Sequence, residues 1–193
     1  MKFLTYSGNN IIHAHLPDRA EILYAPASLP GIRKRDVPQA VVAAFRNPLG
    51  MPPLPELVNA SSKILIVFDD NCQPFPKTSQ PDIRRQAMEA LLPMLYACGV
   101  KKENLRLICA VALHRKMKEH ELSEMVGPRI MRDFYPGQLG NWDAEDPDDI
   151  ARLGETEQGE PVEVCRAVVE SDLSVTQDRL GCNALRGQNG ARF

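Results

Sequence analysis

The sequence lacks any run of about 18 apolar residues, which a membrane-spanning helix requires. Its opening residues, MKFLTYSGNN, contain no apolar segment of the kind found in secretory signals. The 23 Lys and Arg residues are balanced by 25 Asp and Glu residues, and they form no extended basic field of the kind that binds nucleic acid. We therefore expect a cytoplasmic protein that binds neither membranes nor nucleic acid.

Closely spaced cysteines are also missing. No CxxC motif occurs, and an odd number of scattered cysteines in a chain without a signal indicates free thiols. We therefore predict neither a zinc site nor a disulfide framework. The five residues are Cys72, Cys98, Cys109, Cys165 and Cys182.

The first pattern in the sequence that predicts a structure is a segment of alternating apolar and polar residues. KFLTYSGNNIIHAHLP alternates apolar and polar residues around an SGNN turn, which predicts a β-hairpin. His13 and His15 would share one face of its second strand. An HxH pair can chelate a metal, but no third ligand stands at a suitable spacing, so we interpret both histidines as solvent-exposed.

A strand–helix–strand pattern dominates the middle of the sequence. The apolar run KILIVFDD, residues 63–70, predicts a buried strand, and LRLICAVAL, residues 105–113, predicts another. Between them, residues 82–98 place apolar side chains on one face of a helix. Such a βαβ unit predicts an α/β fold with a parallel sheet and flanking helices.

The sequence also contains residues that mark the start and the end of the predicted helix. Ser79 and Asp82 form a plausible capping pair at its start, and Gly99 suits a left-handed residue after its end. Pro93 lies inside the helix and predicts a kink or a break. A shorter helix is expected at 118–126.

The last third of the sequence is less regular. NWDAEDPDD predicts a solvated acidic loop, and GEPVEVCRAVVESDL a short strand followed by a helical turn. Residues 174–193, SVTQDRLGCNALRGQNGARF, show no usable period. We therefore predict one domain over residues 1–173 and an unpatterned, disordered tail over 174–193.

Candidate site residues follow the two buried strands. Parallel strands end at a common edge, where α/β folds bind ligands, so Asp69, Asp70, His114 and Arg115 would face one crevice. His114 is a candidate general acid or base that a carboxylate could orient. At most one of the two adjacent aspartates should line the crevice, since neighbouring strand residues point opposite ways. The simpler interpretation of Arg115 is a surface salt bridge. The simpler interpretation of Cys72 is a structural role.

These motifs, in their order, resemble the N-terminal domain of the nickel-pincer lactate racemase family over about residues 23–173. The segments that carry the resemblance are FRNPLGMPPLPEL, ILIVFDDNCQPFP, GVKKENLRLICAVALHRKMKEHELSEMVG and DAEDPDDIARLGETEQGEPVEV. The resemblance implies the N-terminal domain of a two-domain racemase-like fold.

The resemblance also implies a chemistry. Family enzymes are isomerases that racemise small 2-hydroxy acids with a nickel-pincer nucleotide, a nickel pyridinium-3,5-bisthiocarboxylate mononucleotide. Its nickel centre accepts a hydride from the α-carbon, while two histidines exchange the hydroxyl proton. The family's THR motif places one of these histidines at His114. The family's cofactor-binding D-x-x-R-P loop corresponds here to Asp70, Asn71, Cys72, Gln73 and Pro74.

This sequence departs from the family pattern in ways that bear on activity. Gln73 stands where the loop has its arginine, so a charged bidentate contact to the cofactor is lost. The segment with the second catalytic histidine, the cofactor-bearing lysine and a nickel-ligating histidine has no counterpart, and no metal ligand is assigned. The resemblance therefore implies a truncated domain that is inactive alone, with a separate C-terminal domain as its partner.

Two alternatives belong to other classes of protein. The chain could be a stand-alone module that binds a nucleotide or a small acid, or one half of a split enzyme. A metal hydrolase that uses His13, His15 and Asp70 would require these three groups to converge.

Overall fold

The computed structural model describes residues 2–7, 10–21, 31–71, 80–111, 114–178 and 181–185. The chain divides into two compact units, residues 1–31 and 32–193. The first unit contains the predicted hairpin, in which β1 (Lys2–Ser7) pairs antiparallel with β2 (Asn10–His15). His13 and His15 are both exposed.

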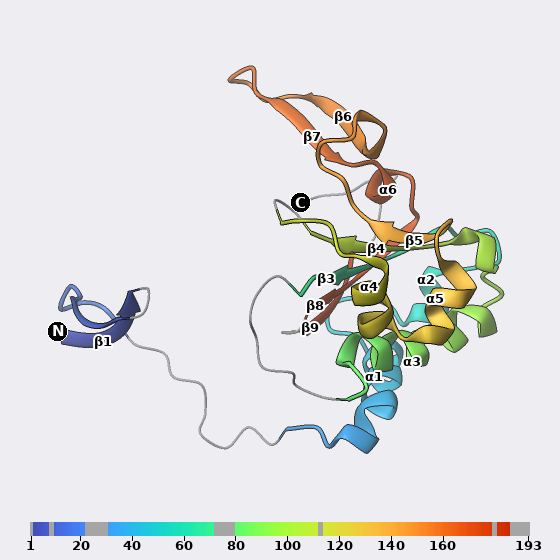
Figure 1. Ribbon diagram of the computed structural model, residues 1–193, viewed down its shortest axis with the longest axis horizontal. Coiled ribbons are helices and arrows are strands. Elements are labelled where there is room, and N and C mark those ends of the chain that lie inside the picture. Colours follow the sequence, from blue (N-terminus) through green and yellow to red (C-terminus); the bar gives the residue numbers. More distant parts are fainter. Residues whose placement is uncertain are drawn as a thin grey trace. The chain divides into compact units, whose positions relative to one another are not determined.

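The second unit holds the remaining helices and strands, shown in Figure 1. Its helical elements are η1 (Lys34–Asp36), α1 (Val37–Arg46), α2 (Leu54–Leu57), α3 (Ile83–Ala97), η2 (Lys102–Asn104), α4 (Glu119–Val126), α5 (Pro128–Phe134), η3 (Pro147–Asp149) and α6 (Arg166–Val169). Its strands are β3 (Ile64–Asp69), β4 (Leu105–Ala110), β5 (Leu139–Asn141), β6 (Ile150–Glu155), β7 (Pro161–Cys165), β8 (Leu173–Asp178) and β9 (Gly181–Leu185).

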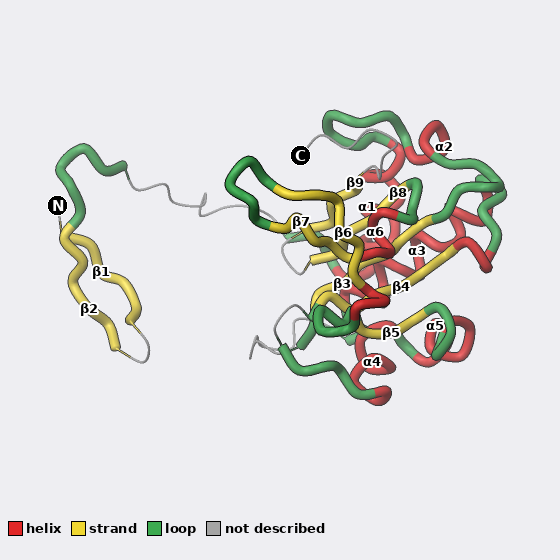
Figure 2. Tube along the Cα trace, turned by 90° about the horizontal axis from the view of Figure 1, so that it is seen from above, coloured by secondary structure: helices red, strands yellow, loops and turns green. Residues whose placement is uncertain are grey.

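Five of these strands form one sheet in the order β5-β4-β3-β8-β9. β3, β4, β5 and β8 are parallel, and β9 pairs antiparallel with β8. The chain runs from β3 through α3 to β4, as the βαβ pattern predicts, and Ile64 lies opposite Leu105. Figure 2 shows β3, β4 and β5 side by side from above. The predicted α/β class with a parallel sheet is confirmed.

The core lies mainly on one face of this sheet. Ile64, Ile66 and Phe68 of β3 are buried in the larger hydrophobic cluster with α3, α4 and α5, because alternate strand residues share a face. Leu65 points the other way and packs with Ile108 and Ala167 of α6 in a smaller cluster. In Figure 1, α1, α3, α4 and α5 lie on one side of the sheet and α6 on the other.

Helix α3 agrees with its sequence signals at both ends. The Asp82 side chain caps it by accepting a hydrogen bond from the Arg84 backbone N–H at 2.9 Å, and Gly99 follows with φ of +85°. Ser79, the other half of the predicted capping pair, lies outside the described residues. The helix continues through Pro93 without a break. Its buried face is wider than predicted, because Met88 is also fully buried.

The end of the domain differs from the boundary predicted at residue 173. Residues Leu173–Asp178 form β8, which pairs with β3 on one side and β9 on the other. Val175 is fully buried, and the hydroxyls of Ser171 and Ser174 lie 3.0 Å apart within hydrogen-bonding distance. Backbone pairing on both sides and local polar contacts let a weakly apolar segment occupy an inner strand.

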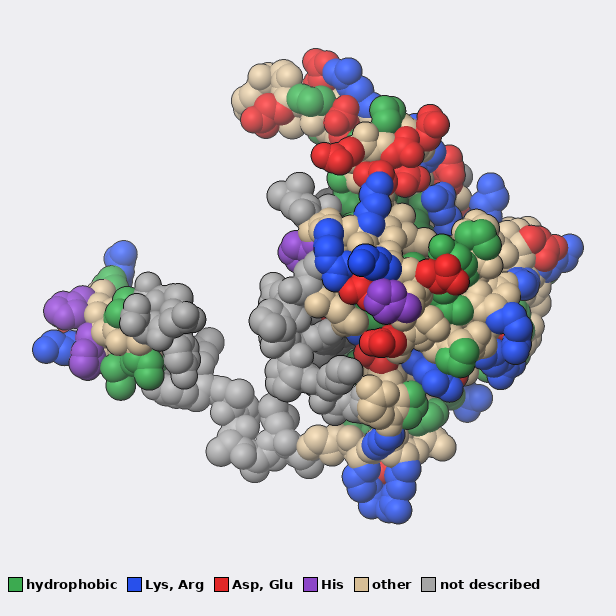
Figure 3. Space-filling model, in the orientation of Figure 1, with side chains coloured by type: hydrophobic (Ala, Val, Ile, Leu, Met, Phe, Trp, Pro, Cys, Tyr) green, Lys and Arg blue, Asp and Glu red, His purple; other side chains and the backbone are tan. Residues whose placement is uncertain are grey.

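The segment between β5 and β8 forms a two-stranded antiparallel hairpin, β6–β7, as Figure 1 shows. Acidic side chains gather over η3, β6 and β7 in Figure 3. The predicted strand and helical turn correspond to β7 and α6. None of the described helices is long and apolar enough to cross a membrane.

The structure of β8 leads to a stability prediction. We expect Val175→Ala to lower the free energy of unfolding by about 2 kcal/mol, because it removes methyl groups from a fully buried site. Val169→Ala, a control at a side chain that is 43% exposed, should change it by less than about 0.5 kcal/mol. Urea unfolding of both variants is the measurement, and equal small effects would contradict the placement of β8 in the core.

Candidate functional site

Polar side chains gather at the carboxyl edge of the parallel sheet. β3 ends at Asp69 and is followed by Asp70 and Asn71, β4 is followed after a short connection by His114, and β5 ends at Asn141. Because β3, β4 and β5 are parallel, these residues meet at one edge. The structure therefore brings together groups that are up to 72 positions apart in the sequence, between Asp69 and Asn141.

The closest contact at this edge joins His114 and Asp70. The Nδ1 atom of His114 lies 2.6 Å from Oδ2 of Asp70. The Asp70 side chain is 7% exposed and the His114 side chain 46% exposed. The carboxylate is thus buried behind an imidazole that faces outward, which is the arrangement of an orienting acid and a proton-transfer base.

This contact determines which imidazole nitrogen is available for chemistry. An ionised carboxylate only accepts hydrogen bonds, so Nδ1 of a neutral His114 must carry the proton that it donates to Asp70. The lone pair is then on Nε2, at the other side of the ring. His114 can take a proton through Nε2 while Asp70 stabilises the positive charge that forms.

Asp69 and Asp70 have different surroundings, as expected for neighbouring strand residues. Oδ1 of Asp69 lies 3.5 Å from a guanidinium nitrogen of Arg84, whereas Asp70 contacts His114. Cys72 and Gln73, the other two residues of the predicted cofactor loop, lie outside the described residues.

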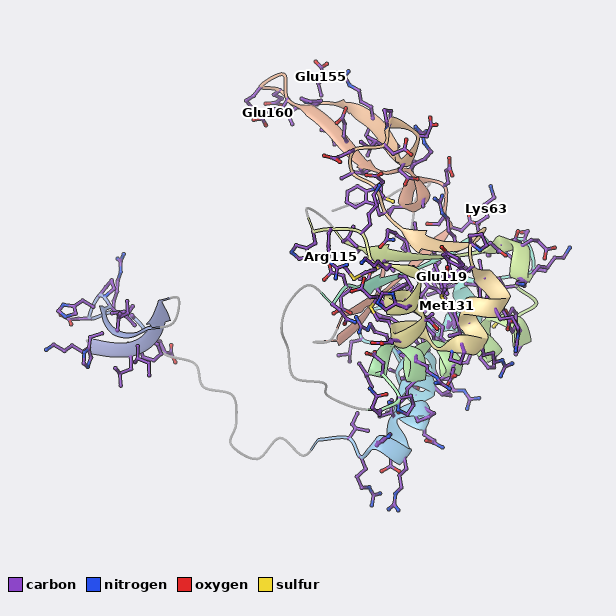
Figure 4. All side chains as sticks on the ribbon, in the orientation of Figure 1. Lys63, Arg115, Glu119, Met131, Glu155 and Glu160 are labelled. Atoms are coloured by element: carbon purple, nitrogen blue, oxygen red, sulfur yellow. The ribbon has the colours of Figure 1, made fainter. Side chains whose placement is uncertain are left out.

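Arg115 forms a surface salt bridge, as predicted. Its guanidinium donates to both carboxylate oxygens of Glu121 at 2.6 and 2.7 Å, and the Lys118 backbone N–H donates to Glu121 at 2.8 Å. The hydrogen bonds from Arg115 and Lys118 lower the pKa of Glu121 to about 2. Figure 4 marks Arg115 after β4 and Glu119 at the start of α4. This salt bridge ties the chain beyond His114 to α4.

The end of β5 holds the same segment from the other side. The Asn141 side chain accepts from the Met117 backbone N–H at 2.8 Å and donates to the Met117 carbonyl at 2.9 Å. Lys116 forms an ion pair with Asp143, and this hydrogen bond raises the pKa of Lys116 and lowers the pKa of Asp143. Sequence reasoning missed these anchors, because their partners are 24 and 27 positions apart.

A buried arginine supports the turn after β3, and sequence reasoning missed it as well. Arg84 has a side chain that is 2% exposed, and its guanidinium donates to the backbone carbonyls of Asp69 and Asp70 and to the side chain of Asn71. A signal was available, because Arg84 occupies the same helical stripe as the buried residues Met88, Leu91 and Leu95. A charge on an apolar stripe indicates a specific partner.

Outside the carboxyl edge, the described residues offer a polar cavity and no metal cluster. A polar cavity of about 280 Å³ lies at the opposite, amino edge of the sheet, among residues such as Lys63, Arg106 and Gln138. Within the described ranges, no three His, Cys, Asp or Glu side chains group so that they could hold a metal ion. We place the site at the carboxyl edge, because the imidazole–carboxylate contact lies there.

The parallel sheet with flanking helices defines an α/β domain, and its imidazole–carboxylate pair lies at the carboxyl edge, where α/β folds bind ligands. The model of the lactate racemase N-terminal domain family matches residues 7–191, nearly the whole sequence. The chain therefore belongs to the lactate racemase N-terminal domain family. The match extends through β8 and β9, beyond the boundary predicted at residue 173.

Individual relatives are more distant. The chain is 23% identical over 152 residues to a lactate racemase of Thermoanaerobacterium thermosaccharolyticum, an alignment that covers 79% of this chain and 33% of the relative. The solved lactate racemase apoprotein of the same organism superposes with a TM-score of 0.53 at 21% identity, over 91% of this chain and 38% of that one. The chain thus spans about a third of the length of this curated relative.

The pKa of Glu121 generates a prediction on stability against pH. Since its folded-state pKa of about 2 lies below its ordinary value of 4.5, the salt bridge stabilises the fold fully above pH 4.5 and progressively less as pH falls toward about 2. The destabilisation caused by Glu121→Gln should therefore be largest above pH 4.5 and shrink below it. Thermal unfolding across this range is the measurement.

Glu119→Gln supplies the matched control for that series. Glu119 is also in the first turn of α4, and the structure records no ion pair for it among the described residues. The comparison removes the general effect of a carboxylate near a helix N-terminus. An identical pH profile for the two variants would contradict the role of Glu121.

Proposed function

We propose that this chain supplies the proton-transfer half of a 2-hydroxy-acid racemase site, with His114 as the base. The observation that carries the proposal is the 2.6 Å contact between His114 and the buried Asp70, which leaves Nε2 on a half-exposed imidazole. Membership of the lactate racemase N-terminal domain family supports lactate or a related small 2-hydroxy acid as the substrate class.

Racemisation at a carbon that bears a hydroxyl requires that hydroxyl proton to leave and return. In this proposal Nε2 of His114 accepts the proton, Asp70 stabilises the imidazolium, and Nε2 gives the proton back after the α-carbon has been inverted. Asp70 thus acts chiefly on His114, a more specific role than the cofactor contact that the loop resemblance implies. Arg115 takes no part, because Glu121 engages it.

The nickel-pincer nucleotide, when bound, would supply the acceptor for the hydride from the α-carbon. The donor set at the carboxyl edge fits the proton-transfer side of that chemistry, and the described residues contain no cluster of three or more His, Cys, Asp or Glu side chains that could hold a metal ion by themselves. We propose that the loop Asp70, Asn71, Cys72 and Gln73 contacts the nucleotide and that a separate C-terminal domain completes the site. The chain alone should then not racemise lactate.

Binding of the nickel-pincer nucleotide to the purified chain tests this proposal. We expect wild type to bind and Asp70→Ala to bind at least about tenfold more weakly, a loss of about 1.4 kcal/mol, because the loop and the imidazole lose their shared contact. His114→Ala should also weaken binding. His120→Ala is the matched control, since His120 is an exposed histidine on α4 that the proposal does not use.

Three outcomes would contradict parts of the proposal. Equal binding by wild type and Asp70→Ala would remove Asp70 from the site, and absence of binding by every form would remove the cofactor from this chain. Lactate racemisation by the chain with added cofactor would contradict the proposed need for a C-terminal domain.

A further inference from the structure

Among the described residues, Arg84 is the most deeply buried charged residue, with a relative exposure of 2%. It projects from the first turn of α3 into the space beneath the carboxyl end of β3. A buried cation is costly unless every donor finds an acceptor. The partners of Arg84 therefore indicate what the residue is for.

Its guanidinium group has five N–H donors, and the structure assigns a hydrogen bond to each. Nη1 donates to the carbonyls of Asp69 at 2.7 Å and Asp70 at 3.2 Å. Nη2 donates to Oδ1 of Asn71 at 2.7 Å and to Oδ2 of Asp82 at 2.8 Å, and Nε donates to Oδ1 of Asp82 at 2.9 Å. One planar group thus joins three consecutive residues, the last of β3 and the two that follow it, to the cap of α3.

The same partners keep the guanidinium of Arg84 positively charged. Burial alone would lower the pKa of Arg84, but the hydrogen bond and charge of Asp82 and the charge of Asp69 outweigh burial and raise it. The guanidinium therefore stays ionised, and its hydrogen bonds keep their charge-assisted strength. Arg84 and Asp82 together form a rigid bracket around the turn.

This bracket lies directly behind the proton-transfer pair. The carbonyl of Asp70 accepts from Arg84, while the side chain of Asp70 contacts His114 at 2.6 Å. The backbone of Asp70 is therefore fixed from one side and its carboxylate is presented on the other. An apolar residue at position 84 would continue the stripe of Met88 and Leu91, but it could not hold the turn.

We infer that Arg84 is a positioning residue that sets the orientation of Asp70 and, through it, the proton-bearing nitrogen of His114. Its importance for catalysis rests on the proposed function, whereas its effect on His114 is a property of the ligand-free chain. The two can therefore fail separately. Lysine should not substitute, because its ammonium has three donors and no planar fork to span five acceptors.

The test is ¹⁵N NMR of the His114 imidazole in the ligand-free chain at alkaline pH, where histidine is neutral. We expect the Nδ1–H form to predominate in wild type and to lose that predominance in Arg84→Lys, as in Asp70→Asn. Arg85→Met is the matched control, because Arg85 is the next residue of α3 and pairs with Glu89 instead. It should leave the His114 spectrum unchanged.

Asn71→Ala keeps the test decisive if Arg84→Lys does not fold. Asn71 is exposed, and its side chain accepts a hydrogen bond from Arg84, whereas His114 contacts Asp70. Replacing Asn71 therefore loosens the bracket and leaves the core intact. A shift toward the Nε2–H form in Asn71→Ala supports the inference. An unchanged His114 spectrum in Asn71→Ala, or in a folded Arg84→Lys, overturns it.

Nucleotide binding separates this inference from the proposed function. If the His114 spectrum responds to Arg84→Lys but wild type does not bind the nickel-pincer nucleotide, the positioning role stands and the proposed function fails. If wild type binds and the spectrum does not respond, the positioning role fails alone.

Discussion

The parallel pairing of β3 with β4 is the constraint on which the rest of this site depends. Asp69 lies opposite Ala110 at the ends of the two strands, so the residues that follow them emerge at the same edge. A carboxylate and an imidazole 44 positions apart are thereby brought into contact. An antiparallel pairing would place the end of one strand beside the start of the other and separate the two groups.

Three polar anchors hold that edge, and one of them is a buried charge. Arg84 fixes the turn after β3, the pair of Arg115 and Glu121 ties the chain after His114 to α4, and Asn141 fixes the same chain to β5. Each anchor satisfies polar groups that would otherwise cost free energy at a partly buried edge. The apolar core supplies most of the stability, while these contacts determine how the site residues are directed.

The sequence alone predicted those helices and strands whose signal lies in neighbouring residues. The apolar runs of β3 and β4 and the stripe of Ala87, Leu91 and Leu95 follow directly from strand and helix periods, and together they dictate the βαβ unit. The prediction that Asp70 and His114 lie at one edge followed from parallel topology alone. The start of α3 was also predictable, because its capping residue is next to the helix that it caps.

The features that were missed depend on partners distant in the sequence. β8 has the polar residues Ser174 and Gln177 beside Val175, and it is a strand because β3 and β9 flank it. The roles of Arg84 and Asn141 come from backbone atoms of other segments, which no periodicity reveals. Neither the direction of the Asp70 side chain nor the protonated nitrogen of His114 could have been assigned without these contacts.

Selective chemical labelling of the four histidines tests the central claim most directly. Carbethoxylation by diethyl pyrocarbonate modifies an unprotonated imidazole nitrogen, and mass spectrometry resolves His114 from His13, His15 and His120. The account predicts that His114 reacts in the free chain and is protected by the nickel-pincer nucleotide, while the other three histidines react equally with and without it. Reaction of His114 at the same rate in the presence of saturating nucleotide would contradict the placement of the site at this edge.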